Sequence, residues 1–254
     1  MLDDPLRPLV SAYADAFELL AAATTGRARR GSDGLVLAIC GAPLAAFNGI
    51  ISPSREPDPD EIESLANSET WDCPWSIQVR GDPGPLVTQV AARHGLTEVT
   101  RQPLMVRPPE LGVPAEPTIE SLRVRAISEG ELRAYAAAVA DGFEAPRQMF
   151  EVMTNPAVAR IERVTFYSSE LDGIPVGTGM TAVSGDVTGI YQIATFPQYR
   201  RRGYGRAVTT EMVRAGFAAS AATAYLYASE MGESIYIATG FRTEEYLTVI
   251  AAPS

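Results

Sequence analysis

Arginine and glycine residues gather in one short segment in a pattern suited to holding an anion. Residues 197–206 read Pro-Gln-Tyr-Arg-Arg-Arg-Gly-Tyr-Gly-Arg and join the apolar run 190–195 to a helical pattern. A helix N-terminus leaves backbone N–H groups unpaired, and the helix dipole adds positive potential there. Gly203 and Gly205 let the backbone approach a ligand closely, and the arginines supply charge and paired hydrogen bonds. The segment therefore predicts a phosphate or pyrophosphate site.

A second segment follows the next apolar run, 223–228. Residues 229–241 read Ser-Glu-Met-Gly-Glu-Ser-Ile-Tyr-Ile-Ala-Thr-Gly-Phe. Together the two segments resemble the GNAT superfamily of acyl-CoA-dependent N-acetyltransferases. The first is similar to the family's pyrophosphate loop, Q/R-x-x-G-x-G/A, and the second to its Asn-Tyr-Gly-Phe block after the fifth strand. The resemblance covers about residues 121–250 and implies transfer of an acetyl group from acetyl-CoA to a primary amine, by direct attack in a ternary complex.

The resemblance also implies which residues act on the acyl donor. Tyr236 falls on the family tyrosine that protonates the departing thiolate, and Ser229 stands where the family often has a cofactor-contacting Asn. The backbone of the fourth family strand and the amides of the loop hold the pantetheine arm and the pyrophosphate. These residues are Ile193, Ala194, Thr195, Arg201, Arg202, Gly203, Tyr204, Gly205 and Arg206.

The general base does not follow from the family pattern. Ala224 occupies a position where some relatives have a glutamate, and the fourth strand has no acidic residue. Glu230, beside the end of the fifth strand, is our first candidate, acting directly or through a water, and Glu144 is the next. Side chains that alternate along the two strands are candidates for the amine acceptor site, with core packing as the alternative. They are Tyr191, Gln192 and Tyr227.

The elements that position these residues form an α+β pattern. In the second half we expect strands at 122–127, 163–171, 175–183, 188–195, 223–228 and 244–250, with helices at 128–143, 145–155, from 203 and at 233–239. The first half gives a shorter version: helices at 5–23, after the acidic run 56–63 and at 85–94, and strands at 34–40, 44–52, 75–79 and 97–106. Proline-rich residues 107–117 separate the halves. We expect two GNAT-like mixed-sheet halves in tandem: a degenerate one at 1–110 without a cofactor loop, and a catalytic one at 118–254.

Composition excludes several other classes. All 21 basic residues are arginine and the net charge is −10, which argues against nucleic-acid binding and excludes chemistry that needs a lysine. One histidine and two distant cysteines predict no metal site. The N-terminal residues lack a signal-peptide pattern and no run is long enough for a membrane span, so we expect a cytoplasmic protein. Two alternatives stay open: a non-catalytic acyl-CoA-binding regulatory protein, and a transferase of a longer acyl group.

Overall fold

The chain divides into two compact units, each with helices packed on a mixed sheet. The computed structural model describes residues 4–115, 119–229 and 232–253. Unit 1 consists of Met1–Pro103 with Glu245–Ser254, and unit 2 of Leu104–Glu244. The predicted α+β class is confirmed.

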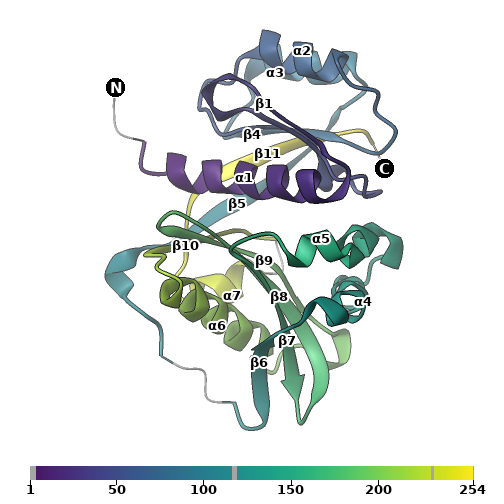
Figure 1. Ribbon diagram of the computed structural model, residues 1–254. Coiled ribbons are helices and arrows are strands. Elements are labelled where there is room, and N and C mark those ends of the chain that lie inside the picture. The colour runs from purple at the N-terminus through teal and green to yellow at the C-terminus, as the bar shows by residue number, and fades with distance from the viewer. Residues whose placement is uncertain (1–3, 116–118, 230–231, 254) are drawn as a thin grey trace. The chain divides into compact units, whose positions relative to one another are not determined.

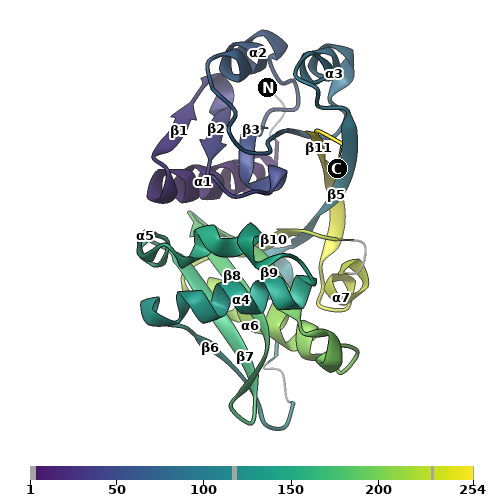
Figure 2. The ribbon, with the colours of Figure 1, turned by 90° about the vertical axis from the view of Figure 1, so that its right-hand side faces the viewer.

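Unit 1 has a sheet in the order β1-β2-β3-β4-β11-β5, in which β3 and β4 run parallel. Helices α2 and α3 cover one face and α1 the other (Figure 2). The elements are α1 (Arg7–Thr24), β1 (Arg27–Arg30), β2 (Val36–Ile39), β3 (Asn48–Ser52), α2 (Pro59–Asn67), β4 (Ser76–Arg80), α3 (Gly84–Arg93), β5 (Glu98–Arg107) and β11 (Arg242–Ala251).

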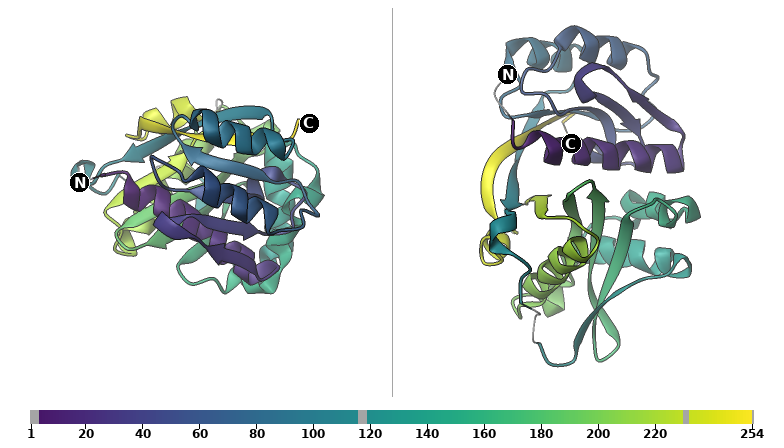
Figure 3. Two further views of the ribbon diagram at one scale, coloured as in Figure 1. Left: turned by 90° about the horizontal axis from the view of Figure 1, so that it is seen from above. Right: turned by 60° about the vertical axis from the view of Figure 1, so that its left-hand side comes forward.

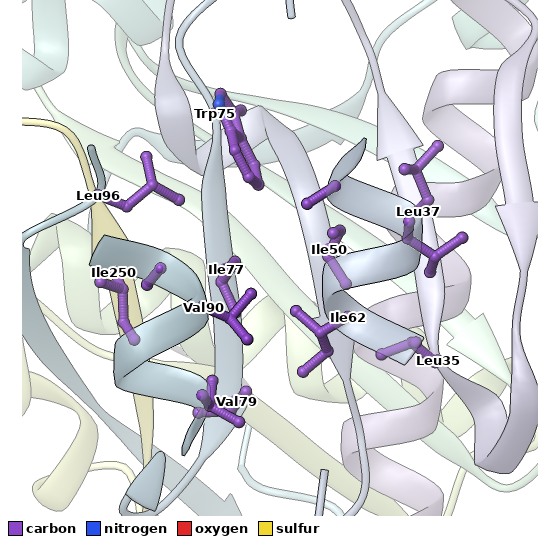
Figure 4. Close-up of a cluster of buried hydrophobic side chains, with 14 of the residues drawn as sticks. Leu35, Leu37, Ile50, Ile62, Trp75, Ile77, Val79, Val90, Leu96 and Ile250 are labelled. Carbon is purple, nitrogen blue, oxygen red and sulfur yellow. The ribbon is translucent and has the colours of Figure 1, made fainter. Parts of the chain in front are cut away.

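The core of unit 1 lies between this sheet and the pair α2 and α3. Alternate side chains of the strands, such as Ile50 and Ile77, meet Ile62 of α2 and Val90 of α3 (Figure 4). Ile250 of β11 belongs to the same cluster, so the end of the chain completes this core.

Unit 2 has the sheet order β5-β10-β9-β8-β7-β6, with β9 and β10 parallel. Helix α6 lies on one face and α4 on the other (Figure 1). The elements are β6 (Leu122–Ala126), η4 (Glu129–Glu131), α4 (Leu132–Phe143), η5 (Arg147–Thr154), α5 (Pro156–Ala159), β7 (Val164–Leu171), β8 (Ile174–Ser184), β9 (Val187–Thr195), η6 (Pro197–Tyr199), α6 (Tyr204–Ala218), β10 (Thr223–Tyr227) and α7 (Glu233–Ile237).

The chain passes from one unit to the other within two strands, β5 and β11. The end of β5 pairs antiparallel with β10 in unit 2, whereas β11 pairs antiparallel with β4 in unit 1. In unit 1, β5 and β11 lie side by side (Figure 3). The compact units therefore divide the chain at different places from the predicted halves 1–110 and 118–254, because each sheet includes a strand from the other half of the sequence.

Most predicted elements correspond to observed ones, and the main difference is β1. Its sequence, Arg-Ala-Arg-Arg, has no apolar alternation. Its backbone pairs antiparallel with β2, and its arginine side chains form ion pairs, Arg27 with Glu69 and Arg30 with Asp15. The second short helix expected at 145–155 is mainly the 3₁₀ segment η5. Among the described residues, no helix combines the length and the apolar character that crossing a bilayer requires.

Candidate active site

The connection between β9 and α6 presents a row of unpaired backbone N–H groups. Arg200 N–H donates to Pro197 O, and the next backbone hydrogen bond in sequence is from Ala207 N–H to Gly203 O. The six N–H groups from Arg201 to Arg206 therefore have no acceptor among the described residues. Left-handed backbone conformations at Arg201 (φ 64°) and Gly203 (φ 83°) shape this turn. Such a turn at a helix N-terminus binds anions.

The charge around this turn is positive. The first turn of α6 carries no acidic residue and no side chain caps it. Arg201, Arg202 and Arg206 are exposed beside it. Arg202 lies over the Tyr199 ring, 5.9 Å from its centroid. The exposed guanidinium groups are therefore available to a phosphate, together with the helix dipole.

Arg200 has a different role, which the sequence did not reveal. Its guanidinium donates to Thr195 O (3.2 Å) at the end of β9 and to Gly142 O (2.8 Å) at the end of α4. It also pairs with Glu144 Oε2 at 2.7 Å. Glu144, our second candidate base, is therefore paired with a cation.

Strands β9 and β10 are paired over a short distance only. Their register runs from Val187↔Thr223 to Gly189↔Tyr225 and stops there. Strand β9 continues to Thr195 and pairs on its other side with β8, where the register shifts near Gln192, which has φ 53°. Residues 190–195, which include Ile193, Ala194 and Thr195, have no strand partner on the β10 side in the part of the chain that the structure describes. Their backbone groups on that edge can pair with an extended ligand.

In the described part of unit 1, neither feature occurs between the parallel strands β3 and β4 or at the start of α2. Strands β3 and β4 stay paired through Ser52↔Val79, the last residue of β3. The N-terminus of α2 is capped by Asp58, whose carboxylate accepts from the N–H groups of Asp60 and Glu61. Both of these residues are acidic, so the first turn of α2 repels an anion.

Tyr236 lies on α7 and is 9% exposed. Burial raises the pKa of its hydroxyl to about 12, so it holds its proton at neutral pH. The hydroxyl makes no hydrogen bond to a described group. Helix α7 is close to the turn: a Cβ placed on Gly205 would lie 3.5 Å from Ile235 Cδ1 and 3.5 Å from Thr195 Oγ1. The end of β9, the start of α6 and α7 therefore meet at Gly205.

The three predicted acceptor residues lie near the point where β9 and β10 separate. Tyr225 and Tyr227 alternate with Ala224 and Leu226, which pack in the α6-side core, so the tyrosines belong to the opposite face. The Tyr191 hydroxyl lies 2.7 Å from that of Tyr225.

Gln192 is held from the α4 side. Its Oε1 accepts a hydrogen bond from the buried Tyr135 hydroxyl at 2.8 Å, and its backbone carbonyl accepts one from Thr178 Oγ1 at 2.9 Å. Tyr135 is a contact that sequence reasoning missed, because a tyrosine in an alanine-rich helix gives no sign of its partner.

The two remaining candidates follow β10 in the sequence. Ser229 is exposed, and its carbonyl accepts from Gly232 N–H at 2.9 Å. Glu230, our first candidate base, lies outside the described residues.

Comparisons with known proteins agree with this geometry. Residues 126–232 match the model of the Acetyltransferase (GNAT) family. A GCN5-related N-acetyltransferase from Kribbella flavida aligns over 97% of this chain and 96% of its own, with a TM-score of 0.69 and 20% identity. A GNAT-family protein from Novosphingobium aromaticivorans aligns over 99% of this chain and 100% of its own, with a TM-score of 0.61 and 15% identity.

A third structure, a GCN5-related N-acetyltransferase from Sphaerobacter thermophilus, aligns over 76% of this chain and 64% of its own, with a TM-score of 0.54 and 17% identity. A search of curated protein sequences gave no match. At these identities the structural likeness establishes the fold, and the sequence match establishes the family of the segment: residues 126–232 form a GNAT acetyltransferase domain.

Proposed function

We propose that this protein is an N-acetyltransferase that moves the acetyl group of acetyl-CoA to a primary amine of a small molecule or peptide. The observation that carries the proposal is the row of six unpaired N–H groups from Arg201 to Arg206 at the positive end of α6. A pyrophosphate supplies the acceptors that this row lacks. The edge of β9 after Gly189 supports the companion role of binding the amide groups of the pantetheine arm.

In the proposed reaction, the amine nitrogen attacks the thioester carbonyl carbon. A C–N bond forms, the C–S bond breaks, and the sulfur leaves as a thiolate that takes the proton of the Tyr236 hydroxyl. The proton lost by the amine goes to a base, for which Glu230, directly or through a water, stays our candidate. After the C–N bond forms and before the C–S bond breaks, a backbone N–H of β9 stabilises the tetrahedral oxyanion.

Only the C-terminal half takes the catalytic role in this proposal, within a tandem of two GNAT-like halves. The order β1-β2-β3-α2-β4-α3-β5 parallels β7-β8-β9-α6-β10-α7-β11, which supports a duplication. The capped, acidic N-terminus of α2 and the continuous pairing of β3 with β4 support a first half without an acyl-donor site.

The test is to incubate the protein with acetyl-CoA and a panel of amines, and to measure thiol release together with the acetylated product by mass spectrometry. We expect one product molecule for each thiol released with at least one amine class. Tight CoA binding without turnover on any amine would favour the non-catalytic regulatory alternative. Faster turnover with propionyl- or longer acyl-CoA would favour a different acyl donor.

A further inference from the structure

Arg107, the last residue of β5, is a buried cation in unit 2 without an acidic partner. It is 4% exposed, and no carboxylate of the described residues forms an ion pair with its guanidinium. Burial lowers its pKa, and no neighbouring charge offsets that effect. Removing a guanidinium from water is unfavourable unless other groups replace the solvent. The hydrogen-bond acceptors around Arg107 therefore identify the chain segments that its guanidinium holds in place.

Three backbone carbonyls accept hydrogen bonds from this guanidinium. Its Nε donates to Thr239 O at 3.2 Å, its Nη1 to Gly112 O at 2.7 Å and its Nη2 to Leu111 O at 3.4 Å. The guanidinium carbon also lies 5.8 Å from the centroid of the Phe217 ring on α6. Arg107 thus joins β5 to the segment after α7, to the connection after β5 and to α6.

Thr239, which accepts a hydrogen bond from Arg107, is itself hydrogen-bonded to the backbone of Tyr236. The Thr239 N–H donates to Tyr236 O at 3.0 Å, and the Thr239 hydroxyl donates to the same carbonyl at 2.9 Å. The N–H of Phe241 is a third donor to it, at 3.0 Å. Residues 239 and 241 therefore fix the backbone of Tyr236. Arg107 in turn holds residue 239 through the hydrogen bond to its carbonyl.

We propose that Arg107 is a positioning residue, which sets the place of the Tyr236 hydroxyl by holding the segment after α7. This inference rests on the proposed function for the catalytic meaning of that place. Among the described residues, the hydrogen bonds of Arg107 go to Thr239, Gly112 and Leu111, and none goes to the β9 edge or to the segment 201–206. Loss of Arg107 is expected to lower kcat while leaving acyl-donor binding nearly unchanged.

The test compares Arg107→Met with Arg214→Met as a matched control. Arg214 also binds a carbonyl of the connection after β5, Pro114 O at 2.9 Å, and no hydrogen bond or ion pair joins it to a described residue of α7. Tyrosine labelled with ¹³C at Cζ reports the place of Tyr236 without any activity, and the signal absent from Tyr236→Phe assigns it. We expect Arg107→Met to shift or broaden this signal and to lower kcat about tenfold. CoA affinity should stay within about threefold, and Arg214→Met should change none of these values.

Two further variants separate positioning from general loss of stability. Arg107→Lys keeps the charge and one hydrogen bond, so it should recover most of kcat. In the Tyr236→Phe background, Arg107→Met should lower kcat by less than twofold, because the group that it positions is already absent.

An unchanged Tyr236 signal in the folded Arg107→Met protein would overturn the inference, as would a full tenfold loss added to Tyr236→Phe. If Arg107→Met does not fold, Arg107→Gln takes its place in this comparison: an unchanged Tyr236 signal with unchanged kcat overturns the inference, and a shifted signal with a lower kcat supports it. A parental kcat in Tyr236→Phe would instead refute the acid role in the proposed function, and the Tyr236 signal would still decide whether Arg107 sets its place.

Discussion

A change of charge at Gly203 tests the anion site with little disturbance of the fold. Gly203 has φ 83°, and a Cβ placed there would meet only Ile119 Cδ1, at 3.7 Å. Asn and Asp both tolerate the left-handed conformation and have nearly the same shape. Gly203→Asn and Gly203→Asp should therefore share any backbone strain, and their difference isolates the negative charge beside the N–H groups 201–206.

The size of the effect follows from the charge separation. A carboxylate about 5 Å from a phosphate charge costs about 3 kcal/mol at an effective dielectric constant of about 20. Since the turn is exposed, solvent reduces this repulsion to about 1.5–2 kcal/mol, which is at least a tenfold loss of affinity. We expect CoA to bind Gly203→Asp at least about tenfold more weakly than Gly203→Asn in calorimetric titrations. Equal affinities in two folded variants would refute the assignment of this turn to the pyrophosphate.

Two further predictions concern unit 1. We expect titration to give one CoA per chain, because Asp58 caps α2 and β3 stays paired with β4 to its last residue; two molecules per chain would contradict this. The second concerns Asp4, whose carboxylate pairs with the buried Arg80. Mainly through that hydrogen bond, Arg80 lowers the pKa of Asp4 from its ordinary value of 3.8 to about 2. The pair therefore contributes stability above about pH 4 that is lost as the pH falls towards 2. Asp4→Asn should lower the unfolding free energy by about 1–2 kcal/mol at pH 7 and flatten its decline between pH 4 and 2 in urea titrations, whereas an unchanged decline would exclude this pair as its cause.

Local pattern predicted most of the elements. The helix expected at 5–23 and the strands expected at 163–171, 175–183 and 188–195 correspond closely to the observed α1, β7, β8 and β9. These elements are specified by neighbouring residues, so the sequence is sufficient to find them. The turn at 197–206 belongs to this class as well, since its glycines and arginines are consecutive.

The pairing of strands that are far apart in the sequence could not be predicted from local residue patterns. Strand β5 is the last strand expected in the first half, and nothing in its residues shows that its last part pairs with β10. The same limit applies to the contacts of single arginines. Within the run 200–202, the sequence does not distinguish Arg200, which binds Thr195 and Gly142 carbonyls, from its exposed neighbours.

The measurement that tests the account most directly is the turnover number of Tyr236→Phe with a good amine acceptor. The substitution keeps the buried ring, which packs against Phe241 with 6.2 Å between centroids, and removes only the hydroxyl. We predict a folded protein that binds acetyl-CoA within a few-fold of the parent and has a kcat lower by about 10²-fold or more, the usual contribution of a general acid. A parental kcat across all accepted amines would contradict the proposed reaction.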